Sequence, residues 1–171
     1  METTAKIRSN ALRAAATMLA GAVPAAALAE TATSSLGVTA TVTENCTVST
    51  APVAFGSVNT LSGGNVDATG GVTVTCTNGT PWAASASAGT GTGASLTTRK
   101  MVSGADTLSY SLYTDSARTS IWGDGTATTA TVANTGSGSA QTFTVYGRVL
   151  SGQASASAGS YSDTVSVTIS Y

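Results

Sequence analysis

The sequence predicts an all-β sandwich, and three observations lead to that prediction. Valine, threonine and serine alternate in short runs with a period of two residues, which is typical of strands with one buried face. Glycine, asparagine and aspartate separate these runs, as turns between strands require. No stretch after residue 29 has the periodicity of an amphipathic helix.

Residues 1–29 are predicted to be a secretory signal peptide that is removed from the mature protein. Lys6, Arg8 and Arg13 precede an uncharged, alanine-rich run ending in Ala27-Leu28-Ala29, which matches an A-x-A cleavage site. The run is shorter than the ~18–20 apolar residues that a bilayer span needs, so a transmembrane anchor is the weaker alternative. We therefore expect an exported chain that begins near Glu30 and has no membrane span.

Two cysteines, Cys46 and Cys76, follow the predicted leader. In an oxidising compartment an isolated pair is most simply one disulfide. In the chain-entropy model, closing a loop of about thirty residues stabilises the fold by ~3.5 kcal/mol. A zinc site would need further ligands, and the sequence has no histidine and no third cysteine. No metal and no cofactor are expected.

The first part of the exported chain begins with an alternating segment over 36–43. Its apolar face consists of Leu36, Val38, Ala40 and Val42. Further strands are predicted over 46–48, 72–77 and 81–88, and a loop over 56–71. Asn78-Gly79 is a two-residue hairpin signal, so the strands on either side of it are expected to pair.

The second part of the chain ends in its most regular strand, over 164–171. One face of that strand carries Val165, Val167, Ile169 and Tyr171. Earlier strands are predicted over 96–101, 108–113, 121–122, 126–133 and 143–149. The alternating segments at both ends carry almost no charge, although a sandwich must cover or blunt its sheet edges. The pattern allows two arrangements: both segments pair within one domain, or one of them pairs with another molecule.

Catalysis and nucleic-acid binding are not expected. Without histidine there is no Ser-His-Asp or Cys-His arrangement. Four aspartates, Asp106, Asp115, Asp124 and Asp163, lie in turn contexts, where aspartate is favoured for its bonds to the backbone. Trp82 and Trp122 are expected in the core rather than stacked on a sugar. Without the leader the net charge is about −3, with no basic patch for nucleic acid.

Three stretches of the chain resemble the spore coat protein U domain family. They are YSLYTDSARTSIWGDGT from Tyr110 to Thr126, VYGRV from Val145 to Val149 and GSYSDTV from Gly159 to Val165. The positions of Cys46 and Cys76 also fit the family. That family includes the pilins of the archaic, Csu-type chaperone–usher pathway.

The resemblance implies an incomplete immunoglobulin-like β-sandwich that lacks its final strand and is completed by a donor strand from a neighbouring subunit. Residues 30–43 would be the donor extension, with Leu36, Val38, Ala40 and Val42 facing the groove, and 44–171 the pilin domain. The small side chain of Ala40 would mark a shallow pocket or a shifted register. Val165, Val167, Ile169 and Tyr171 would form the edge of the acceptor groove.

The same resemblance implies the partners and the function. The partners would be identical or related pilin subunits, a periplasmic chaperone and an outer-membrane usher, and the product a cell-surface fimbria for adhesion and biofilm formation. Two alternatives are a self-contained secreted coat or matrix protein and a carbohydrate-binding fimbrial adhesin.

Overall fold

The computed structural model describes residues 29–61 and 63–171, so all of the predicted signal peptide except Ala29 lies outside the described residues. The described part contains ten strands and no helix. It therefore contains no helix with the length and hydropathy to cross a membrane. The strands are β1 (Cys46–Ala51), β2 (Val66–Cys76), β3 (Pro81–Ala86), β4 (Arg99–Ser103), β5 (Asp106–Tyr113), β6 (Ile121–Trp122), β7 (Thr129–Ala130), β8 (Val132–Thr135), β9 (Gln141–Val149) and β10 (Val167–Ser170).

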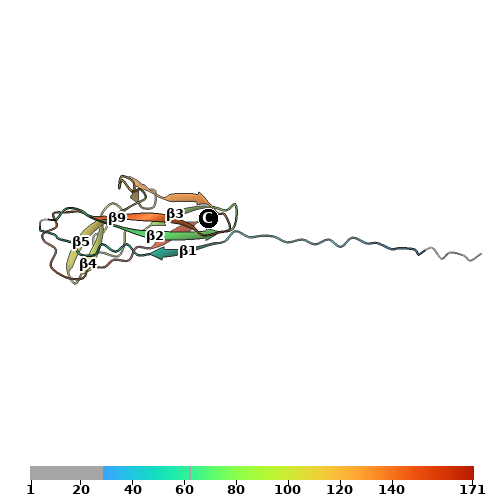
Figure 1. Ribbon diagram of the computed structural model, residues 1–171, viewed down its shortest axis with the longest axis horizontal. Coiled ribbons are helices and arrows are strands. Elements are labelled where there is room, and N and C mark those ends of the chain that lie inside the picture. The colour runs from blue at the N-terminus through green and yellow to red at the C-terminus, as the bar shows by residue number, and fades with distance from the viewer. Residues whose placement is uncertain (1–28, 62) are drawn as a thin grey trace, which may run out of the picture. The chain divides into compact units, whose positions relative to one another are not determined.

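The strands form two sheets, which confirms the all-β prediction. The larger sheet has the order β1-β2-β9-β5-β6-β7, with β4 also paired to β5. The smaller sheet has the order β10-β3-β8. Every named pair is antiparallel except β6 with β7. Figure 1 shows β1, β2 and β9 running alongside one another, with β3 close by.

The core lies between the two sheets and follows the period of two that the sequence shows. Val72, Val74 and Cys76 of β2 are buried, and the threonines between them are only partly buried. Trp82, Ala84 and Ala86 of β3 face them from the smaller sheet. The other buried apolar residues of the described chain are Leu108, Tyr110, Leu112, Trp122, Val145 and Val149. Side-chain alternation on each strand therefore separates the core from the surface.

The predicted loop over 56–71 is wrong at its C-terminal end, because β2 begins at Val66. Gly70 and Gly71 lie inside this strand, where glycine usually argues against a strand. At Gly70 the reason is a close approach of another segment. A Cβ there would lie 2.7 Å from the carbonyl oxygen of Ala51 and 2.7 Å from Cγ2 of Val53.

The hairpin predicted at Asn78-Gly79 is also wrong, although the turn itself forms. Thr80 N donates to the Thr77 carbonyl at 3.1 Å, and Gly79 has a φ of 86°. The strands before and after this turn belong to different sheets, so the turn carries the chain across the sandwich. The buried residues of β2, from Val72 to Cys76, and those of β3, from Trp82 to Ala86, face each other across the core rather than pairing edge to edge.

The disulfide prediction is confirmed. Cys46 and Cys76 are joined, with an S–S distance of 2.03 Å, and they lie opposite each other in the register of β1 and β2. The bond therefore fixes an edge strand of the larger sheet to its neighbour. Cys76 is also part of the buried core.

Arg99 is a buried charge that the sequence did not reveal. Its side chain is fully buried at the start of β4. The guanidinium donates to the carbonyl oxygens of Ser87 at 2.8 Å, Leu96 at 2.9 Å and Trp122 at 2.8 Å. Burial lowers the pKa of this group, while the nearby Tyr110 and Asp163 act to raise it. Its hydrogen bonds join the β3–β4 connection to β6.

The chain divides into two units, at Thr39 and Ala40. The second unit contains all ten strands. In the first unit the structure describes residues 29–39, which form no strand and are exposed throughout. An alternating segment without a pairing partner has no sheet to join, so the strand-like pattern that begins at Leu36 is not realised as a strand.

Candidate functional site

The sandwich is open on one side, between one edge of each sheet. β1 forms an edge of the larger sheet and β10 an edge of the smaller one. Among the described strands, β10 pairs with β3 alone, and β1 with β2 alone. Each therefore has one side whose backbone groups are available to a further strand.

A cavity of about 420 Å³ lies between these two edges, and we call it the inner cavity. Thr50 and Ala51 at the end of β1 line one side, and Val165 and Val167 line the other. Its floor is the hydrophobic core itself, formed by Val72, Tyr110, Leu112, Trp122 and Val145. The inner cavity thus reaches the core, although the core residues in its floor are only 2–5% exposed.

A second cavity of about 990 Å³, the outer cavity, continues the first. It lies between the segment from Val53 to Leu61 and the segment from Ala154 to Tyr161, over Leu108. The two cavities share Val53, Phe55, Met101 and Tyr161. Together they form one groove with both polar and apolar lining, called the groove below.

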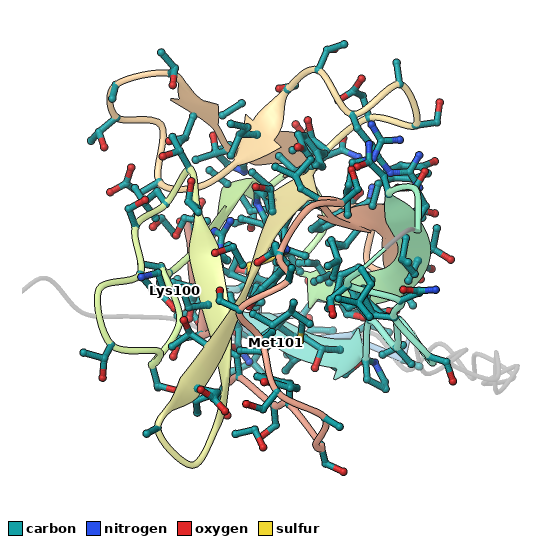
Figure 2. All side chains as sticks on the ribbon, turned by 90° about the vertical axis from the view of Figure 1, so that its left-hand side faces the viewer. Lys100 and Met101 are labelled. Carbon is teal, nitrogen blue, oxygen red and sulfur yellow. A yellow bond between two sulfur atoms is a disulfide. The ribbon has the colours of Figure 1, made fainter. Side chains whose placement is uncertain are left out.

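Met101 lies at the point where the two cavities meet. It is partly buried and packs against the core, and its neighbour in β4 is Lys100. Figure 2 labels both residues, whose side chains project from β4 in different directions. The alternation along β4 therefore places an apolar side chain in the groove and leaves the ammonium group away from it.

The residues predicted as the acceptor edge fall into two groups. Val165, Val167 and Ile169 are half-buried and pack against the core, and the first two line the inner cavity. Only residues 167–170 form β10, in register with Ala83 to Ala86 of β3. Tyr171 lies beyond the strand and is 56% exposed.

The wall of the groove before β10 is an irregular segment, Tyr161 to Ser166, held by hydrogen bonds. Ser162 and Val102 exchange two backbone bonds, of 2.9 and 3.1 Å. At the other end Ser87 N donates to the Ser166 carbonyl at 2.9 Å, and Ser166 N donates to Ser87 Oγ at 2.9 Å. The segment is therefore anchored on both sides of Asp163.

Asp163 anchors the middle of this wall. Its Oδ1 accepts bonds from Thr90 N at 2.8 Å and Thr90 Oγ1 at 2.9 Å, and its Oδ2 accepts one from the Tyr110 hydroxyl at 2.7 Å. Burial opposes its ionisation, but the bonds from Thr90, Tyr110 and Thr164 outweigh that effect and hold its pKa below the ordinary value. Burial, and then the bond to Asp163, raise the pKa of Tyr110 well above its usual range.

The predicted donor residues are among the most exposed apolar side chains of the described chain. Leu36 is 88% exposed, Val38 84% and Val42 83%, and Ala40 is exposed as well. Burying such side chains is favourable by roughly 0.8 kcal/mol per CH₂ group. An apolar face of this kind, presented in water, is typical of a segment that binds elsewhere.

The chain matches the family model of the spore coat protein U domain over residues 32–168. The chain belongs to the spore coat protein U domain family. The match includes the predicted donor residues as well as the whole β body up to the middle of β10. The family model therefore covers both the alternating segment before β1 and nearly all of the strands on either side of the groove.

Among solved structures, this spore coat U domain is similar to a chain of the CsuC–CsuE chaperone–tip adhesion subunit pre-assembly complex from the archaic chaperone-usher Csu pili of Acinetobacter baumannii. The two are 22% identical, with a TM-score of 0.55, over 77% of this chain and 40% of that chain. This chain thus spans about two-fifths of the length of the chain it matches. The likeness supports the fold. No curated protein matches the chain.

Sequence reasoning missed several residues of the site. Val53 and Phe55 line both cavities, yet they lie in an irregular segment with no alternation to indicate burial. Tyr110 lies in the floor of the groove. The alternation over 108–113 indicates a buried face but not this position.

The structure gives no support for a binding site at the two tryptophans or at the turn aspartates. Trp82 and Trp122 are 4% and 2% exposed, so neither can stack on a sugar, and the predicted core position is confirmed. Asp115 and Asp124 accept hydrogen bonds within their own turns, from Thr119 and Ser120 and from Thr126. Within residues 29–61 and 63–171, no group of three or more His, Cys, Asp or Glu could hold a metal ion.

Proposed function

We propose that this chain is a structural subunit of a surface pilus that is assembled by donor-strand complementation. The observation that carries the proposal is the groove, which opens the core between two unpaired strand edges. A strand inserted there would pair with β10 through its backbone and place alternate side chains on the core. The missing element is therefore one strand with one apolar face.

The chain's own N-terminal segment has that property. Leu36, Val38, Ala40 and Val42 are apolar, exposed and two residues apart, and threonine or glycine separates them. When the segment of one copy fills the groove of the next, the contact is head-to-tail. Such a contact does not close into a dimer and propagates as a filament.

The partners follow from this arrangement. A periplasmic chaperone would cover the open groove before assembly, and an outer-membrane usher would pass subunits to the cell surface. The similar solved structure, a chaperone–tip adhesion subunit complex, supports a chaperone partner. The proposed role of the fibre is attachment and biofilm formation, and no catalytic step is included.

A charge placed on one face or the other of the donor segment tests the proposal. The full chain would be exported with its chaperone and usher, and polymers detected as SDS-resistant ladders that disappear on boiling. Leu36→Asp with Val38→Asp should abolish the ladders, as should deletion of residues 31–43. Thr39→Asp with Thr41→Asp adds the same charge to the opposite face and should keep them. Ladders that survive the deletion would rule out donor-strand assembly and favour a laterally associating coat protein.

A further inference from the structure

The three sequence stretches that resemble the spore coat U family meet across the floor of the groove. Tyr110 begins the first stretch, Gly147 is in the second and Asp163 is in the third. Phe55, which belongs to none of them, lies between two of these residues. These four residues form a continuous series of contacts, which we call the cross-groove series.

The series begins at one wall of the groove. A Cβ at Gly147 would lie 2.8 Å from Cζ of Phe55 and 2.7 Å from Cγ1 of Val53, so the absence of a side chain at this position makes room for both. Phe55 then packs edge to face against the Tyr110 ring, with centroids 5.9 Å apart. The wall that bears Val53 and Phe55 is therefore positioned by Gly147 of β9 on one side and by the Tyr110 ring on the other.

The series ends at the opposite wall. Tyr110 is 5% exposed in the floor, and its hydroxyl donates to Asp163 Oδ2 at 2.7 Å. Gly89 allows the approach on that side, because a Cβ there would collide with the Asp163 carboxylate. One side chain in the floor thus contacts both walls, through its ring on one side and its hydroxyl on the other.

We propose that Tyr110, Asp163 and Phe55 are positioning residues for donor-strand capture, which set the spacing of the two groove walls before the donor arrives. The proposal rests on the donor-strand function above. A groove whose walls are already spaced for a strand avoids the ordering cost that a collapsed or mobile groove would impose on binding. Tyr110 is suited to this role because the wall bearing Asp163 has no regular strand pairing of its own before Val167.

Binding of a donor peptide separates this role from a general effect on stability. The acceptor would be the full chain with its own donor disabled by Leu36→Asp and Val38→Asp. The probe would be a fluorescent peptide of residues 31–43, followed by anisotropy, with the melting temperature measured for every variant. Tyr110→Phe removes only the hydroxyl. The anchors at Ser162 and Ser166 remain, so this variant should still fold.

A matched control is available at Asp115, which accepts bonds from Thr119 and Ser120 in a turn that does not line the groove. Each substitution disturbs the hydrogen bonds of one carboxylate: Asp115→Asn replaces the carboxylate itself, and Tyr110→Phe removes a donor to Asp163. We expect Tyr110→Phe to bind the peptide at least tenfold more weakly and Asp115→Asn to bind it as the parent does. Phe55→Leu, which leaves the Tyr110–Asp163 bond in place, should also weaken binding.

Combining substitutions at Tyr110 and Asp163 shows whether both residues affect donor binding through the hydrogen bond between them. Tyr110→Phe with Asp163→Asn should bind the peptide no more weakly than the weaker of the two single variants, because both remove the same interaction. Parent-like binding by Tyr110→Phe and Phe55→Leu would overturn the positioning role and leave the donor-strand proposal intact. Failure of the parent itself to bind the peptide would overturn both proposals.

Discussion

The hydroxyl of Tyr110 donates a 2.7 Å hydrogen bond to Oδ2 of Asp163, which lies 53 positions later in the chain. One partner is in β5, in the middle of the larger sheet, and the other is in the irregular segment before β10. The bond therefore ties the floor of the groove to the wall that leads into its edge strand.

Stability should depend on the ionisation of Asp163 at acid pH. Its pKa in the folded protein is below the ordinary 3.8, so the folded state binds this proton less readily than the unfolded chain. The stabilisation is therefore present above about pH 4 and is lost as pH falls through the folded pKa. The buried Arg99 interacts electrostatically with this carboxylate and stays ionised throughout.

Melting temperatures of the parent and Asp163→Asn between pH 2 and pH 7 measure this effect. The variant should be the less stable at pH 7, and the difference should shrink as the pH falls below 4. A difference that stays constant over this range would show that the charge of Asp163 contributes nothing to the fold.

Replacing Arg99 should be among the most damaging single changes in the β body. Arg99→Met removes the donors to the carbonyls of Ser87, Leu96 and Trp122, of which the bond to Trp122 is buried and the other two are part-buried. Unsatisfied buried groups cost about 1–3 kcal/mol each, so we expect a loss of roughly 3 kcal/mol or more. Urea denaturation would measure it, and Lys100→Met in the same strand is the control. Equal midpoints for the two variants would contradict the structural role of Arg99.

Removing the disulfide should destabilise the edge strand β1 most. Cys46→Ala with Cys76→Ala should lower the free energy of unfolding by about 3 kcal/mol. Hydrogen exchange should show the largest loss of protection in residues 46–51, because the bond fixes that strand to β2. A reductant should reproduce the effect in the parent and have none in the double variant. Protection in β1 that survives the substitution would show that strand pairing alone holds this edge.

Adding a methyl group at Gly147 should disturb the groove wall. The new Cβ would lie closer than 3 Å to both Val53 and Phe55, so these side chains must move, at a cost of about 1–3 kcal/mol. Gly64→Ala is the matched control, because a Cβ there meets nothing within 4 Å. Chemical denaturation of the two variants compares the costs. Similar stabilities would mean that the wall accommodates the methyl group without strain.

Much of the fold could be predicted from the sequence, because alternation identifies a strand with one buried face. Strands β5, β9 and β10 and the buried face of β3 were found in this way. The single strand predicted over 126–133 is wrong, because the chain there forms two short strands, β7 and β8, that join different sheets. The first half of β2 was missed because Gly70 and Gly71 are there to admit Ala51 and Val53, and that reason is visible only in three dimensions. The predicted pairing of β2 with β3 is wrong because a turn sequence does not say which sheet the next strand joins.

The site was predicted in part. The exposed apolar face from Leu36 to Val42 and the half-buried face of β10 follow from alternation. Phe55, Tyr110 and Asp163 acquire their roles from contacts between segments far apart in the chain, which no local pattern encodes. Arg99 was missed for the same reason, because its acceptors are carbonyls of three separate segments.

Cross-linking between two copies tests the central claim most directly. The acceptor copy would carry Val165→Cys in the wall of the inner cavity, with its own donor disabled by Leu36→Asp and Val38→Asp. The donor copies would each carry one cysteine along the segment, at position 36, 38, 39, 40, 41 or 42. Insertion of the donor in a fixed register predicts an inter-chain disulfide at the one or two even positions that lie nearest to residue 165, and little at 39 and 41. Equal cross-linking at odd and even positions would contradict insertion of the donor in the groove. So would donor–acceptor complexes in which no donor position forms a disulfide with residue 165.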